Sequence, residues 1–381
     1  MKATEDVTGI ATIKLLQTGE TISGGGSKTT VTKNFTVTEN GTYTIEVTTV
    51  GGRKTTSKIT VTSILEQVNP GVILAATKEY TDDQGANAWV PKGFKIVSDG
   101  STGNKSRVSE GLVIEDIDGN QFVWIPCTVL QLNEPAWQEW IDYAYAVNGS
   151  NGLEPENLTV VGNSISSYGG FYLGRYEAGY SEGTSVVPEG NAAGIPLSKK
   201  NATVWNNIGQ PTAMARSSAM YSGSDSVVSH LMYAAEMRRV LRWFVETGSL
   251  NWSQINNNST SWGNYQSSQI TGVTKYHEYN ASMYSSSYTI SSGTTKTSGT
   301  AWRFATGNTD YTKVNNIYDL AGNILEWTQE WTVPQWGSSL PLWRGGDSDA
   351  AGYPVIWSYN GGGADYVGDC VGFRVALYIK L

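Results

Sequence analysis

The first 66 residues alternate apolar and polar side chains, and this period of two restricts the fold more than any other feature of the chain. The apolar residues that keep to the alternation are Phe35, Val37, Tyr43, Ile45, Val47, Ile59 and Val61. Alternate side chains of a strand point to the same face, so each run predicts a strand with one buried face. Gly51 and Gly52 lie between two runs and predict a hairpin turn.

Residues 1–66 contain no Trp, Cys or Pro, and a segment of this size built from such strands is expected to form a small all-β sandwich. Asn40–Ile45, followed by Gly52 and Lys58–Val61, resembles the small bacterial immunoglobulin-like (Ig-like) modules of surface and phage proteins. The resemblance implies a spacer that presents another domain. Gln67–Gly71 predicts a boundary, and residues 67–89 are expected to form a linker.

The composition excludes several classes of function. Charged residues make up only 16% of the chain, its net charge is -8 and its pI is about 5.0. Such a chain has no electrostatic reason to approach phosphate or an anionic membrane, so neither nucleic-acid binding nor membrane insertion is expected. The 43 glycines, 14 tryptophans and 21 tyrosines indicate a loop-rich fold that leans towards β-structure.

The chain offers few residues for thiol, metal or histidine chemistry. Cys127 and Cys370 are able to pair, but they make neither a disulfide framework nor a CxxC metal motif. His230 and His277 are the two histidines, which nearly excludes zinc and leaves little scope for histidine-based catalysis. The N-terminus has no apolar signal-peptide core, and no apolar run reaches the ~18 residues of a membrane span.

Two helices are expected after the boundary. Residues 134–147 place Trp137, Trp140, Ile141 and Ala144 on one face. Residues 224–247 predict a stronger helix with an apolar stripe, a cap at Asp225 or Ser226 and a stop at Gly248. Its polar side carries three arginines, which are expected to pair with nearby acids rather than bind phosphate; they are Arg238, Arg239 and Arg242.

Residues 281–300 contain 12 Ser or Thr and predict a long exposed loop. Short strands are expected at residues 301–304, 316–320, 323–328, 342–346 and 372–379. Two helices among many short strands and long loops, with neither a βαβ repeat nor a solenoid period, indicate an α+β fold.

Four segments then occur in a characteristic order, namely Gly169–Glu177, Ile317–Thr328, Leu342–Gly346 and Gly372–Ala376. Together they resemble the formylglycine-generating-enzyme (sulfatase-modifying factor) family, which is a variant of the C-type lectin fold. The GNxxEWT block and the closing RGG and GFRVA blocks are specific as a set. The resemblance covers residues 90–381 and implies a compact, loop-dominated α+β domain.

The resemblance does not carry the family's chemistry with it. The family's oxidase uses a pair of cysteines just upstream of the GFR block to bind copper. Here Trp357–Asp369 contains no cysteine, Cys370 stands alone, and Cys127 lies outside the motif. A non-catalytic member that requires no cofactor is therefore favoured, and a copper-dependent formylglycine-generating oxidase is the enzymatic alternative.

Residues 347–370, between the RGG and GFR blocks, contain no Lys, Arg or His and carry the palette of adaptable binding loops. The predicted ligand-binding residues are Asp347, Asp349, Tyr353, Val355, Trp357, Tyr359, Asn360, Asp365, Tyr366 and Asp369. This arrangement resembles the variable region of proteins diversified by phage and bacterial diversity-generating retroelements. Such regions are mutated at adenines, chiefly in asparagine codons, which reach Asp, Tyr and Cys but never Trp. Trp357 is then a fixed anchor, and an ordinary polar loop is the alternative.

The resemblance also implies a structural calcium site at Asp319, Gly322, Ile324 and Glu326, because in the family an acid or amide, two backbone carbonyls and the Glu of GNxxEW bind calcium. Oxygen ligands suit calcium. The alternative is that Glu326 bonds backbone amides. Asn323 and Trp327 are expected to be buried framework.

The favoured function is a non-enzymatic adhesin or receptor-binding protein whose partner is a protein or glycan on a cell surface. Four aspartates in the segment favour a basic or hydroxyl-rich partner. A phage tail or a bacterial cell surface is the expected location, and the missing signal peptide favours the virion. A fixed-specificity carbohydrate-binding domain is the second alternative. Phage-tail relatives are often trimers, but no heptad supports that here, so the oligomeric state is open.

Overall fold

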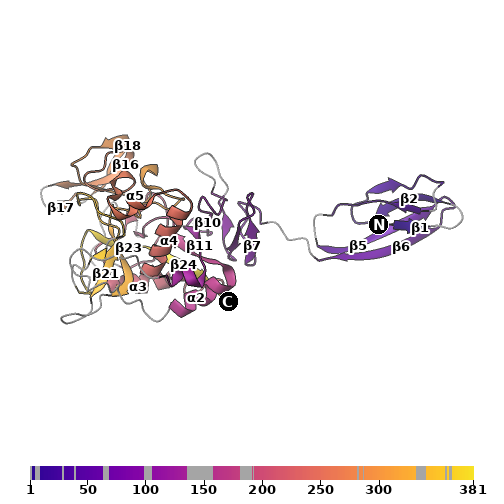
Figure 1. Ribbon diagram of the computed structural model, residues 1–381, viewed down its shortest axis with the longest axis horizontal. Helices are drawn as coiled ribbons and strands as arrows, with labels where there is room; N and C mark the ends of the chain where they lie inside the picture. The colour runs from indigo at the N-terminus through magenta and orange to yellow at the C-terminus, as the bar shows by residue number, and fades with distance from the viewer. Residues whose placement is uncertain are drawn as a thin grey trace. The chain divides into compact units, whose positions relative to one another are not determined.

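The computed structural model divides the chain into two compact units, Met1–Gln67 and Val68–Leu381 (Figure 1). Every structural statement below concerns the residues that the structure describes. These are residues 2–4, 9–27, 30–37, 40–62, 68–97, 105–134, 158–180, 191, 193–280, 283–285, 287–331, 340–356, 358–359 and 363–381.

The first unit is built from strands alone in its described part. A four-stranded antiparallel sheet has the order β3 (Thr21–Ser23), β2 (Ile10–Leu15), β5 (Gly41–Thr49) and β6 (Lys54–Val61). A second pair joins β1 (Lys2–Thr4) to β4 (Thr30–Thr32). Its core consists of Ile10, Ile13, Leu15, Val31 and Ile45.

The predicted hairpin turn between β5 and β6 is confirmed, because Gly52 has φ +82°, which favours glycine. The burial predicted for Ile59 is wrong, since that side chain is 44% exposed. It lies on β6, which is at the edge of the four-stranded sheet and has a neighbour on one side alone.

The second unit is organised around a six-stranded antiparallel sheet. Its order is β15 (Val227–Leu231), β24 (Val375–Ile379), β12 (Gly170–Gly174), β11 (Gln121–Pro126), β10 (Val113–Glu115) and β9 (Lys95–Ile96). Alternate residues of β11 enter two different cores, Val123 and Ile125 one, Phe122 and Trp124 the other. The sheet is therefore buried on both faces.

Helices cover one face of this sheet, where α2 (Leu158–Tyr168) and α4 (Ala234–Glu246) pack against β11, β12 and β24 (Figure 1). The short helix α1 (Val129–Leu132) contacts both of them. On the other face the core includes Trp205, Trp327 and Phe373, and α3 (Gln210–Ala219) contacts β15 and β20.

The linker predicted at residues 67–89 is wrong over most of its length. Strands β7 (Lys78–Thr81) and β8 (Asn87–Val90) form a hairpin there. Val68, Leu74, Tyr80 and Ala88 are buried in the core on that second face. Their apolar side chains are spread among turn residues, which concealed the hairpin from the sequence pattern.

A second sheet carries the motif blocks. Its order is β22 (Ser358–Tyr359), β21 (Pro341–Arg344), β20 (Leu325–Trp331) and β23 (Val371–Phe373), with β20 and β23 parallel. A third sheet joins β16 (Ile270–Asn280) to β17 (Met283–Tyr284), β18 (Thr289–Lys296) and β19 (Trp302–Phe304). The smaller elements are β13 (Gly179–Tyr180), β14 (Thr203–Val204), α5 (Trp252–Asn256), η2 (Ser259–Ser261) and η3 (Asp310–Thr312).

Two sequence predictions for this unit need correction, and a third lies outside the described residues. Residues 281–300 contain the strands β17 and β18 rather than one long loop, because β18 pairs with β16 while leaving most of its own side chains exposed. Residues 316–320 form turns rather than a strand, and Asn316 and Asp319 adopt positive φ. The helix predicted at 134–147 lies almost entirely outside the described residues.

The helix predicted at 224–247 is wrong in its first half. Residues 227–231 form β15, which pairs with β24, and α4 begins only at Ala234. The Glu236 carboxylate accepts the Tyr233 N–H (2.8 Å) at the true helix start, so neither Asp225 nor Ser226 is the cap. The predicted stop is confirmed, since Gly248 follows the C-cap with φ +72°.

Many short strands and a few helices, arranged in several sheets, make the described chain α+β, as the sequence predicts. Among the described residues, no helix is both long enough and apolar enough to cross a membrane.

Candidate functional site

Arg374 of the GFR block joins the two sheets. Its guanidinium donates to both carboxylate oxygens of Glu326 on β20, with Nε distances of 3.0 and 3.1 Å and an Nη2 distance of 2.6 Å. It also donates to the carbonyls of Gly174 (3.0 Å) and Tyr318 (2.9 Å). Both charged side chains are at most 1% exposed. Through these contacts Arg374 connects its own block, Gly372–Ala376, with two of the other three motif blocks, Gly169–Glu177 and Ile317–Thr328. The RGG block is not among them.

Asn323 of the GNxxEWT block is a second buried junction. Its side chain accepts the Phe304 N–H (2.7 Å) and donates to a carboxylate oxygen of Glu177 (2.6 Å). Trp327 is fully buried, and its indole N–H donates to the Ile208 carbonyl (2.7 Å). The prediction that Asn323 and Trp327 are buried framework is confirmed.

Arg344 of the RGG block is also buried and satisfied. Its Nε donates to Glu330 of the neighbouring strand (2.9 Å), and its Nη2 contacts the same carboxylate oxygen. Its Nη1 donates to the Ile356 carbonyl (2.8 Å). In each of these three motif blocks the polar residues therefore serve the interior of the fold.

The four predicted calcium ligands lie near this junction. Asp319 accepts from the Gly307 N–H and the Thr312 hydroxyl, both at 2.6 Å, and is fully buried. Both oxygens of Glu326 face Arg374, not backbone amides. The described residues contain no cluster of three or more His, Cys, Asp or Glu able to hold a metal. Calcium binding at Asp319, Gly322, Ile324 and Glu326 stays a prediction.

Three carboxyl groups gather around Arg374. Burial raises the pKa of Glu177 well above its usual range, and the neighbouring charges of Asp319 and Glu326 raise it further. Burial also raises the pKa of Asp319 and of Glu326, where Arg374 opposes the shift. These shifts all favour the neutral carboxyl form over a bare negative charge in the interior.

The first part of the predicted binding segment is half-buried. Asp347 accepts the backbone N–H groups of Asp349 (3.2 Å) and Ala350 (2.9 Å) and so closes a turn. Tyr353 packs against the main core. Val355 is fully buried and its N–H donates to Ser259 (3.0 Å). The prediction that Val355 contacts ligand is corrected, because its apolar side chain belongs to the core.

The last part of the segment is exposed and lies outside regular strands and helices. Asp365, Tyr366, Val367 and Asp369 are exposed, with Tyr366 at 38% and Val367 at 41%. The Tyr366 ring rests on Trp343 of β21, 5.4 Å between centroids. A framework tryptophan thus supports an exposed tyrosine.

Three predicted residues of the segment have no described side chain. Tyr359 lies in β22, opposite Trp343, where its backbone alone is described. Trp357 and Asn360 lie outside the described residues.

The two thiols are separate, with Cys127 buried and Cys370 half-buried. Cys127 and Cys370 are both free. Burial raises the pKa of each thiol to about 12. A reactive cysteine needs a lowered pKa, so neither environment activates its sulfur.

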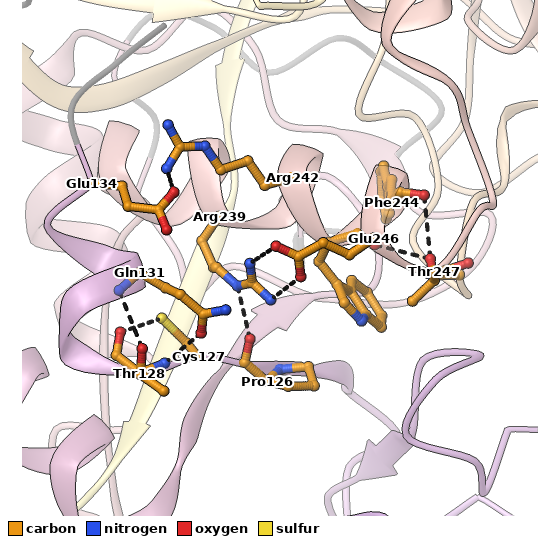
Figure 2. A network of polar contacts seen from close by, with 12 residues as sticks. Pro126, Cys127, Thr128, Gln131, Glu134, Arg239, Arg242, Phe244, Glu246 and Thr247 are labelled. Atoms are coloured by element: carbon orange, nitrogen blue, oxygen red, sulfur yellow. Dashed lines mark hydrogen bonds and ion pairs between the residues drawn. The ribbon is translucent and has the colours of Figure 1, made fainter.

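The arginines of α4 are used within the fold (Figure 2). Arg239 holds Glu246 through two hydrogen bonds of 2.7 Å and donates to the Pro126 carbonyl (2.9 Å). Arg242 pairs with Glu134. The expected pairing with nearby acids is confirmed for these two, although Arg239 is 3% exposed and lies on no solvated face.

Arg303 of the third sheet was not predicted as a site residue, and its neighbour His277 was expected only to offer little scope for catalysis. Arg303 on β19 and His277 on β16 are cross-strand partners, and each is 1% exposed. A charged residue between Trp302 and Phe304, inside an apolar strand, is the signal that points to a buried role.

Comparisons with known proteins do not assign this chain to a family. No protein-family model and no curated protein matches it. Among solved structures, a chain titled "Crystal Structure of CarF" matches with a TM-score of 0.36 and 12% identity over 63% of this chain and 97% of that one. A likeness of this size carries no argument about fold or function.

Proposed function

We propose that the protein is a non-enzymatic ligand-binding protein whose second unit has a C-type lectin fold of the formylglycine-generating-enzyme type. Its ligand is a protein or glycan receptor on a cell surface, and residues 347–370 are the binding surface. The first unit is an Ig-like spacer on a phage tail or a bacterial cell surface.

One contrast carries the proposal. The motif residues Glu326, Arg344 and Arg374 are buried in ion pairs, Glu326 with Arg374 and Arg344 with Glu330. Between Arg344 and Arg374, the chain exposes Tyr366 and two aspartates, Asp365 and Asp369, outside regular strands and helices. Tyrosine with Asp and Gly is typical of surfaces that acquire new partners by substitution.

The thiol chemistry supports a binding role over the oxidase alternative. The family's oxidase needs two thiols beside the GFR block, whereas this chain has Cys370 alone there. The raised pKa of Cys370 keeps its sulfur protonated at neutral pH.

The test is a pair of matched tyrosine variants on an array of glycans and purified bacterial surface proteins. Tyr366→Ala is expected to lower retention on the array by at least about tenfold, since one well-packed aromatic anchor contributes 2 kcal/mol or more at an interface. Tyr279→Ala is the control, because Tyr279 is 37% exposed and also rests on an aromatic ring, that of Tyr284.

Both variants are expected to keep the melting temperature of the wild type to within a few degrees. Equal retention by all three proteins on an array that captures the wild type places the binding surface away from Tyr366. If Tyr279→Ala alone loses retention, the binding surface lies on the sheet of β16 and β18 instead.

A further inference from the structure

Arg303 is a buried arginine without an acceptor among the described residues. None of its three nitrogens makes a hydrogen bond there, and its side chain is 1% exposed. Four other buried arginines differ, because each has a carboxylate or oxygen partner; they are Arg175, Arg239, Arg344 and Arg374. An arginine stays protonated in a protein, so this interior charge has no counter-charge in contact among the described residues.

The guanidinium of Arg303 lies over one aromatic ring. The guanidinium carbon lies 3.6 Å from the centroid of Tyr284. The Tyr284 hydroxyl is 2.7 Å from the Ser348 hydroxyl, which ties the ring to the turn at the start of the binding segment. A cation–π contact satisfies one face of the guanidinium, but it accepts none of the N–H groups at the edge.

His277 is the cross-strand neighbour of Arg303, and neither ring nitrogen makes a hydrogen bond with a described residue. Burial lowers the pKa of His277 to about 4 and the charge of Arg303 contributes, while the backbones of Ser285 and Ser287 act in the opposite direction. The imidazole is neutral at pH 7 and adds an N–H donor but no second charge.

Asp347 is an acid whose pKa the charge of Arg303 influences. Burial, followed by Asp349, raises the pKa of Asp347 to about 8, and the Arg303 charge is only a minor opposing influence. Its Oδ1 is already used by two backbone N–H groups. Asp347 therefore closes its own turn and is largely protonated at neutral pH, so it does not neutralise Arg303.

We propose that Arg303, with His277 beside it, binds a small monovalent anion between the β16–β19 strands and the turn at Asp347–Ala350. Chloride and a carboxylate of the size of formate share the required chemistry, which is one negative charge and acceptors for the guanidinium edge. The near-zero exposure of Arg303 restricts the site to small ions. This inference does not rest on the proposed ligand-binding function.

The first test is the melting temperature of the full chain at constant ionic strength in sodium chloride, sodium formate and sodium gluconate. Bound anion stabilises the folded state by mass action, so chloride or formate is expected to raise the melting temperature by about 2–5 °C over gluconate, which is too bulky. A rise with chloride alone identifies a halide site, and a rise with formate as well identifies a site that also takes carboxylates.

Arg303→Met is expected to abolish the difference between chloride and gluconate. Arg344→Met is the matched control, since Arg344 is equally buried but pairs with Glu330; it is expected to melt lower yet keep the anion effect. An anion effect that survives Arg303→Met overturns the proposal.

The second measurement uses the wild type and holds even where Arg303→Met does not fold. Crystals grown in bromide are expected to show an anomalous peak within about 3.5 Å of the Arg303 guanidinium. No peak there, or identical melting in all three salts, overturns the proposal. A direct Asp347–Arg303 ion pair would also overturn the proposal. In that case the melting temperature of the wild type would not depend on chloride, whereas that of Asp347→Asn would.

Discussion

Asp347 shows how a single buried acid couples stability to pH. Burial raises its folded-state pKa to about 8 from 3.8. The folded chain therefore holds a proton that the unfolded chain has released, so this contribution is complete below pH 3.8 and is lost as pH rises through 8. The residue type alone, an aspartate in a polar loop, gives no indication of this behaviour.

Asp347→Asn should therefore flatten the pH dependence. The amide oxygen still accepts the N–H groups of Asp349 and Ala350 but carries no proton equilibrium. Between pH 5 and 8, the unfolding free energy of the wild type is expected to fall relative to the variant by on the order of 1 kcal/mol per pH unit. Urea unfolding at four pH values measures this slope, and parallel curves for the two proteins would contradict it.

At the scale of strands and helices, two sheets are held together by side chains whose positions the sequence predicted but whose partners it did not. The blocks around Glu326 and Arg374 are recognisable by their order, and both residues are buried at the junction of two sheets. Their pairing with each other was not predictable, since 47 residues separate them in the sequence. The alternative that Glu326 bonds backbone amides is wrong, since its carboxylate accepts from the Arg374 guanidinium, while calcium binding stays a prediction.

Local periodicity predicted the wrong secondary structure where pairing with a strand distant in the sequence determines it. Val228 and Leu231 fit a helical stripe, yet residues 227–231 pair with β24, which lies about 150 residues further along the chain. The Ser/Thr-rich residues 289–296 lack an apolar face and read as loop, but the backbone of β16 provides their hydrogen bonds. Tertiary pairing overrides propensity in both cases.

Glu326→Gln tests the junction between the sheets. Removing one partner leaves the Arg374 charge buried and unpaired, which is expected to lower the unfolding free energy by about 3–5 kcal/mol. Chemical denaturation of the full chain measures the loss. Asp225→Asn is the control, because its pair with Lys92 is exposed and should leave stability unchanged. Equal effects of the two substitutions would show that the buried pair does not hold the sheets together.

At the scale of the molecule, the division into two units was visible in the sequence and the binding segment was visible in composition. Residues 1–66 change to a Trp-rich chain near Gln67, and the first compact unit ends at Gln67. The sequence could not distinguish the buried half of the segment, with Val355, from the exposed half, with Tyr366. That difference arises from packing against Ser259 and Trp343, which are distant in sequence.

The most direct test of the account is one substitution scan of residues 347–370 in which folding and array binding are scored separately. Substitutions at Asp365, Tyr366, Val367 and Asp369 are predicted to preserve folding and to change binding, whereas those at Ser348 and Val355 are predicted to impair folding, since both side chains are fully buried. A scan in which the exposed positions alter folding, or in which none of them alters binding, would contradict it.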